Sequence, residues 1–74
     1  MKTYLSIWFH SEGARPSKVN KKLKGFGFKP TKGSYDFVYE WNNEATMEEV
    51  MNIGNKIQEK LDGGKVLFEL ETIR

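Results

Sequence analysis

The feature that most constrains the fold is a helical segment, residues 46–61, with marked ends and a strand pattern on each side. Thr46 and Glu49 form a capping box, in which each side chain bonds the backbone N–H of the other residue. Apolar residues then recur every three or four positions and give one buried stripe: Val50, Ile53, Ile57 and Leu61. The glycines in Asp62-Gly63-Gly64 predict the end of the helix.

The segments on both sides of this helix alternate with the period of a strand. Residues 35–41 place four aromatic side chains on one face: Tyr35, Phe37, Tyr39 and Trp41. Their other face carries Asp36, Val38 and Glu40. Near the C-terminus, Val66, Phe68 and Leu70 alternate with Leu67, Glu69 and Glu71. The second half of the chain is therefore predicted to be strand, helix, strand.

The first half of the chain repeats this order. In residues 3–10 the apolar positions Leu5, Ile7 and Phe9 alternate with Tyr4, Ser6, Trp8 and His10, which predicts a strand. Pro16 suits the first turn of a helix, and Ser17 is expected to help cap it. That helix has an apolar stripe at Val19, Leu23 and Phe26, and we expect Gly25 to end it. The turn residues that follow allow residues 27–30 to form a short edge strand.

The order β-α-(short β)-β-α-β predicts one α+β domain over residues 1–74. With both helices on one face of an antiparallel or mixed sheet, the expected fold is a ferredoxin-like two-layer sandwich with a short second strand at the edge. The first and third strands are the most aromatic, and we expect them at the sheet centre. A three-stranded sheet without the short strand is the alternative. Because the chain has no cysteine, its stability must come from packing, which its ten aromatic residues favour.

Composition also indicates where the protein works. A chain without cysteine is compatible with a reducing compartment. No apolar run approaches the roughly 20 residues that span a bilayer, and the N-terminus shows no signal-peptide cleavage region. We therefore expect a cytoplasmic protein without membrane contact.

Residues 24–28 (KGFGF) resemble the start of a signature of the RNA-recognition motif, a family with this same fold. In that family the signature lies on a central strand, where its aromatic residues stack on bases. Here Lys29 stands where the signature needs an apolar residue, and Thr31 where it needs an aromatic one. The stretch also follows the first helix directly, at the edge strand. We therefore interpret it as the end of that helix, with Phe26 and Phe28 in the core.

The sheet face that the helices leave open is expected to be acidic. If the apolar positions face the helices, four carboxylates point to solvent: Asp36, Glu40, Glu69 and Glu71. Trp8 and His10 are expected on the same face. Such a face repels a phosphate backbone. An exposed Trp8 near Val38 and Leu67 is instead typical of a protein contact site rimmed by charge.

Charge is divided unevenly along the chain, although the formal net charge is +2. Residues 1–32 hold eight Lys/Arg and one acid, whereas residues 33–74 hold four Lys/Arg and nine acids. The first helix and the following turn therefore carry a basic surface: Arg15, Lys18, Lys21, Lys22, Lys24 and Lys29. We interpret this surface either as a solvated helix face or as a salt-sensitive site for nucleic acid or phosphate.

No residue pattern predicts catalysis, a metal or a cofactor. His10 is the one histidine, whereas zinc sites need three or four converging ligands. No nucleophile–base pairing, phosphate loop or dinucleotide fingerprint is present. The sequence therefore predicts a non-catalytic binding or regulatory domain that makes protein–protein contact, or pairs with a second copy, through the open sheet face at Trp8 and His10. The alternative is non-sequence-specific binding of nucleic acid or phosphate through the basic surface.

Overall fold

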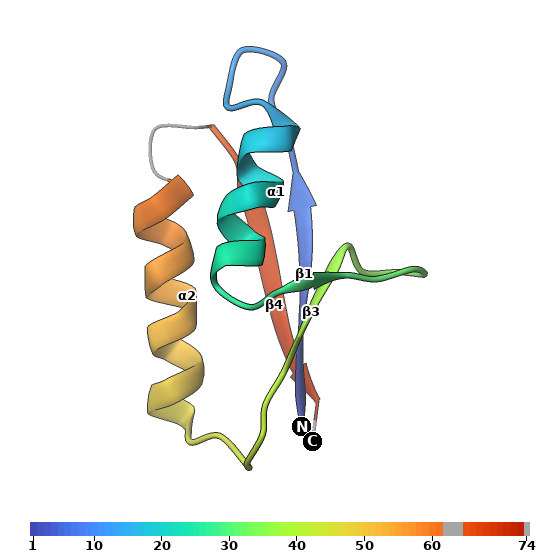
Figure 1. The fold of residues 1–74 in the computed structure, drawn as a ribbon. Coiled ribbons are helices and arrows are strands. Elements are labelled where there is room, and N and C mark those ends of the chain that lie inside the picture. Colours follow the sequence, from blue (N-terminus) through green and yellow to red (C-terminus); the bar gives the residue numbers. More distant parts are fainter. Residues whose placement is uncertain (62–64, 74) are drawn as a thin grey trace.

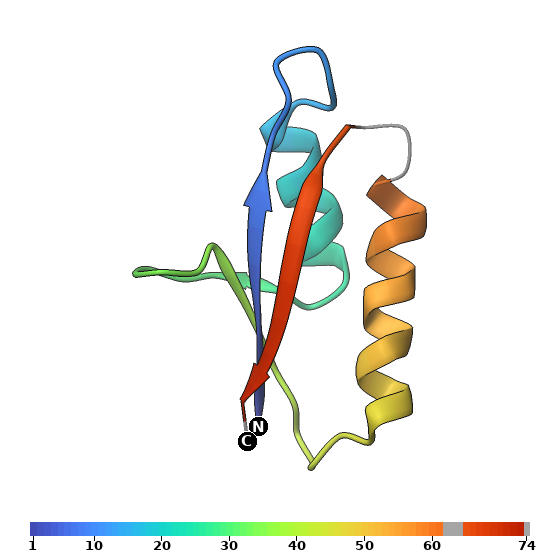
Figure 2. The ribbon, with the colours of Figure 1, turned by 180° about the vertical axis from the view of Figure 1, so that it is seen from behind.

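The structure, a computed structural model, describes residues 1–61 and 65–73. Its elements follow the predicted order: β1 (Lys2–Trp8), α1 (Pro16–Gly25), β2 (Lys29–Pro30), β3 (Phe37–Glu40), α2 (Met47–Leu61) and β4 (Leu67–Ile73). The strands form one antiparallel sheet in the order β2-β3-β1-β4. Both helices lie on one face of this sheet in Figure 1, and the view from behind in Figure 2 shows the opposite face uncovered. The ferredoxin-like α+β sandwich is confirmed, while the helix end predicted at residues 62–64 lies outside the described residues.

The core lies between the two central strands and the helices. It consists of Leu5, Ile7, Val19, Leu23, Phe28, Phe37, Ile57 and Leu61. Full burial of a large apolar side chain stabilises a fold by about 1.5–3 kcal/mol. Burial of the predicted apolar stripes therefore holds both helices against the sheet face that carries Leu5 and Ile7.

One buried polar residue, Thr3, joins three segments of the chain. Its Oγ1 accepts a hydrogen bond from Trp41 Nε1 at 2.8 Å and lies 2.9 Å from Thr72 Oγ1. These bonds offset the cost of burying the hydroxyl. The Trp41 ring also packs edge-on against Tyr39, with ring centroids 4.7 Å apart. Trp41 is half-buried and therefore lies at the rim of the core.

The two helices begin differently. In α2 the predicted capping box is confirmed, because Thr46 N donates to Glu49 Oε1 and Glu49 N donates to Thr46 Oγ1, each at 3.1 Å. In α1 the cap residue is Arg15, whose side chain makes no capping bond. The prediction that Ser17 helps to cap α1 is wrong. Pro16 takes the first helical position, so Ser17 already lies inside the helix.

The helix α1 ends in a Schellman turn, in which Gly27 is the left-handed residue. Phe28 N donates to Leu23 O at 3.1 Å, and Gly27 N donates to Lys24 O at 3.0 Å. The backbone φ of Gly27 is 97°, whereas Gly25 is the last helical residue. The helix therefore ends at Gly25 as predicted, but the left-handed residue after it is Gly27 and not Gly25. The interpretation of KGFGF as a helix end is correct, with Phe28 buried and Phe26 half-buried.

The strand β3 begins two residues later than the alternation predicts, because Asp36 interrupts the ladder. Asp36 N donates to Leu5 O, and Asp36 Oδ2 accepts a hydrogen bond from Ile7 N, both at 2.9 Å. The side chain thus takes the place of strand backbone beside β1. This interruption breaks the alternation, so Tyr35 lies on the open face and not in the core, where we expected it. The carboxylate of Asp36 is likewise held at β1 and does not project from the open face as predicted.

Candidate functional site

The open sheet face carries an exposed apolar pair at one end. Trp8 on β1 lies directly opposite Leu67 on β4. Trp8 is 54% exposed and Leu67 is 73% exposed. Neighbouring side chains on opposite strands pack against each other, so the two form one apolar patch. Its position agrees with the prediction for Trp8.

A stacked pair of tyrosines continues the open face toward the sheet centre. The rings of Tyr4 and Tyr35 stack with their centroids 4.6 Å apart. The Tyr35 hydroxyl donates a hydrogen bond to Glu71 Oε2. This bond, followed by a small loss of hydration and the nearby negative charge, raises the pKa of Tyr35 above its ordinary value. The alternation missed this pair because Asp36 reverses the side on which Tyr35 lies.

Three carboxylates border these aromatic residues. Glu40 is paired with Lys2 at 3.4 Å, and Glu71 accepts the bond from Tyr35. Glu69 lies opposite Ser6, which is not basic. The predicted acidic face is therefore present with Glu40, Glu69 and Glu71, although Asp36 does not belong to it.

Two residues that the sequence assigned to sites lie elsewhere. His10 lies beyond the end of β1, exposed in the following loop, where its Nδ1 accepts a hydrogen bond from Glu12 N at 3.1 Å. It is therefore not part of the sheet face, contrary to the prediction. Lys29 pairs with Val38 across β2 and β3, and residues opposite each other share a face. Lys29 therefore lies beside the open sheet face and not with the lysines of α1.

The rest of the basic surface is brought together on α1. Its exposed members are Arg15, Lys18, Lys21, Lys22 and Lys24. Among the described residues, the two ion pairs join Lys2 to Glu40 and Lys65 to Glu12, so neither involves this helix. Lys22 Nζ donates to the Lys60 carbonyl at 3.1 Å and links α1 to α2.

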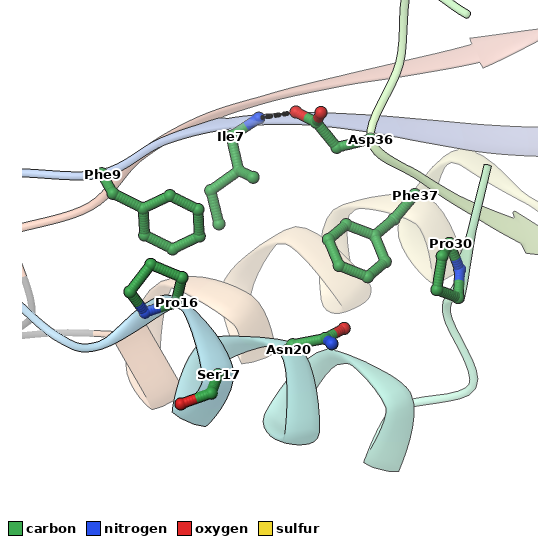
Figure 3. Close-up of a pocket in the computed structure, with 8 residues that line it drawn as sticks. All are labelled: Ile7, Phe9, Pro16, Ser17, Asn20, Pro30, Asp36 and Phe37. Carbon is green, nitrogen blue, oxygen red and sulfur yellow. Dashed lines mark hydrogen bonds between the residues drawn. The ribbon is translucent and has the colours of Figure 1, made fainter. Parts of the chain in front are cut away.

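An apolar cleft of about 380 Å³, which no residue pattern predicted, lies between α1 and the edge of the sheet (Figure 3). Its apolar walls are Ile7, Phe9, Pro16, Pro30 and Phe37, and its polar lining is Ser17, Asn20 and Asp36. Phe9, expected in the core, is 42% exposed here. Asp36 already binds Ile7 N, and the Asn20 Oδ1 atom is buried without a partner in the described structure. The cleft therefore presents few polar groups that a ligand can reach.

Within residues 1–61 and 65–73, no three His, Asp or Glu side chains are grouped to hold a metal ion. Neither described helix combines the length and apolar content that crossing a membrane requires. Comparisons with protein-family models, with curated proteins and with solved structures found no match for this chain.

Proposed function

We propose that this chain is a non-catalytic binding domain that contacts another protein through its open sheet face. The observation that carries the proposal is the exposed Trp8–Leu67 pair on an uncovered sheet. Large aromatic residues in the centre of a contact contribute most of the binding energy of many protein interfaces. The charged residues around the pair form the polar rim that such interfaces have.

The charges around the patch favour one chemistry of partner. Glu69 and Glu71 lie two residues apart on the open face of β4. The basic residue nearest to them on the neighbouring strand, Lys2, is already paired with Glu40. A surface that presents an apolar side chain flanked by lysine or arginine complements this arrangement. A phosphate backbone is repelled by it.

The proposal is tested with Trp8→Ser/Leu67→Ser and, as a control on the opposite side of the molecule, Lys21→Ser/Lys22→Ser. A partner retained by the wild type and by the control should bind the Trp8/Leu67 variant at least tenfold more weakly when the purified proteins are titrated. Light scattering across a concentration series shows whether the partner is a second copy. The proposal is wrong if the Trp8/Leu67 variant keeps every association that the wild type has.

A second candidate, nucleic-acid or phosphate binding, is supported by the five exposed basic residues of α1, which make no ion pair within the described chain. Such binding would be independent of sequence and would weaken steeply with salt. Titration of single-stranded RNA at low and moderate salt tests it, with Lys21→Glu/Lys22→Glu as the disrupting variant. If the wild type shows no binding at low salt, this candidate is excluded.

A further inference from the structure

The strand β4 gives the sheet a long free edge. It has seven residues and, in the described part of the chain, pairs with β1 alone. The opposite edge is β2, which has two residues and contains Pro30, a residue without a backbone N–H. An edge of seven residues with outward N–H and C=O groups is a template for one more strand.

The helix-facing side of β4 is incompletely covered. Phe68 and Leu70 are half-buried, whereas Leu5 and Ile7 on the neighbouring strand are buried. The helix α2 approaches this side through a glycine, since a Cβ at Gly54 would lie 3.5 Å from Leu70 Cδ1. The small residue lets α2 sit close to β4, and Phe68 and Leu70 nevertheless remain partly exposed.

Two methionines of α2 extend this uncovered apolar surface. Met47 and Met51, one turn apart, are 72% and 60% exposed. Met47 borders a hollow together with Thr72 of β4. Gly54, which approaches Leu70 of β4, follows Met51 by three residues and Met47 by seven, so the three residues lie on the same side of α2. The methionines therefore face the free edge of β4, and we name the surface formed by Met47, Met51, Phe68 and Leu70 the β4 ledge.

The other side of β4 determines the charge of an incoming strand. Glu69 and Glu71 lie opposite Ser6 and Tyr4 on β1, neither of which is basic. A second copy of β4, paired antiparallel over all seven residues, would place Glu69 opposite Glu71 of the other copy. Like charges directly opposite each other destabilise a strand pair. Lysine or arginine at those positions would stabilise it instead.

We infer that the free edge of β4 binds an extended segment of a partner protein in which basic and apolar residues alternate. The segment pairs with the outer backbone groups of β4. Its basic side chains lie beside Glu69 and Glu71, and its apolar side chains cover the β4 ledge. This inference rests on the proposed function, because the added strand continues the open sheet face, and it specifies the conformation and chemistry of the partner.

The experiment uses two capped seven-residue peptides, one alternating lysine with valine and the other alternating glutamate with valine. Binding is followed by NMR of the full chain, together with hydrogen exchange of the amides of residues 67–73. The lysine peptide should slow exchange at alternate β4 amides, and the glutamate peptide should not. The variant Glu69→Lys/Glu71→Lys should bind the lysine peptide at least tenfold more weakly than the wild type does. It should bind the glutamate peptide instead. The control variant Glu48→Lys/Glu59→Lys changes the net charge of the chain by the same amount, but on the outer face of α2. It should retain the wild-type preference for the lysine peptide.

Two results would overturn the inference. One is unchanged β4 exchange at millimolar lysine peptide. The other is a shift of Trp8 and Leu67 resonances, sensitive to Trp8→Ser, without protection of β4 amides. The second result would leave the proposed contact through the open face intact and reject only the added strand. If instead the lysine peptide protects the β4 amides and Trp8→Ser/Leu67→Ser does not change this protection, the added strand is supported and the proposed contact through the Trp8–Leu67 pair is rejected.

Discussion

Phe28 donates its backbone N–H to the carbonyl of Leu23 at 3.1 Å, and the side chains of both residues are buried in the core. The bond closes the turn that reverses the chain from α1 into β2. It depends on Gly27, whose φ of 97° lies in a region that residues with a side chain rarely adopt. The turn and the core are therefore joined at one glycine.

Gly27→Ala is expected to destabilise the fold by about 1–3 kcal/mol, because the new residue would be held in a strained backbone conformation. Its Cβ would also lie 3.0 Å from Tyr39 Cε2, so the tyrosine ring must shift. Urea unfolding followed by circular dichroism measures this loss. Binding through the open face should remain in the folded fraction, since Gly27 lies on the helix side of the sheet.

Gly25→Ala is the matched substitution and is expected to act in the opposite direction. Gly25 is the last helical residue, and a Cβ there meets no atom within 4 Å. Replacement of a helical glycine by alanine stabilises by about 0.5–1 kcal/mol. A loss of stability equal to that of Gly27→Ala would contradict the assignment of the Schellman turn.

These two glycines show what the sequence predicts and what it does not. Periodicity depends on many residues at once, so it predicted both helices, their buried stripes and the order of the strands. The choice between Gly25 and Gly27 depends on a single backbone angle, which no repeating pattern records. Asp36 presents the same difficulty, because one side chain replaces strand backbone and moves Tyr35 to the other face. In the candidate site, the alternation of residues predicted the positions of Trp8 and its acidic rim. The Tyr4–Tyr35 stack and the position of Lys29 could be recognised only from the strand pairing in the structure.

Thr46→Ala should destabilise the protein by about 1 kcal/mol, since it removes an acceptor for the N–H of Glu49 at the start of α2. Thr46→Ser retains a hydroxyl and should keep most of the stability. Thermal and urea unfolding of the two variants give the comparison. Equal stability of the alanine and serine variants would show that the capping box does not contribute to folding.

Tyr35 should ionise at a higher pH than an ordinary tyrosine, because its protonated hydroxyl donates to Glu71 and the nearby charge disfavours tyrosinate. The pKa is raised in the folded chain, so the stabilising contribution is fully present below about pH 10 and is lost as the pH rises through the folded-state pKa. The Tyr35 Cζ resonance, followed against pH by NMR, measures this. Glu71→Gln should lower the pKa toward the ordinary value, whereas Glu40→Gln, which alters a carboxylate paired with Lys2, should lower it less. An equal effect of the two substitutions would show that the bond to Glu71 is not the cause.

Asp36→Ala should destabilise the fold by about 1–3 kcal/mol, because it leaves the N–H of Ile7 without its acceptor in the interior of the sheet. Asp36→Asn keeps an oxygen in the same place and should cost less, so the pair of variants separates the hydrogen bond from the carboxylate charge. Hydrogen exchange supplies a local measurement, in which the Ile7 amide should exchange faster in the alanine variant than in the asparagine variant. Because Asp36 also breaks the alternation that would bury Tyr35, the alanine variant should loosen the Tyr4–Tyr35 stack, visible as ring-current shifts at Tyr4. Unchanged exchange at Ile7 in both variants would show that the Asp36 side chain does not take the place of strand backbone.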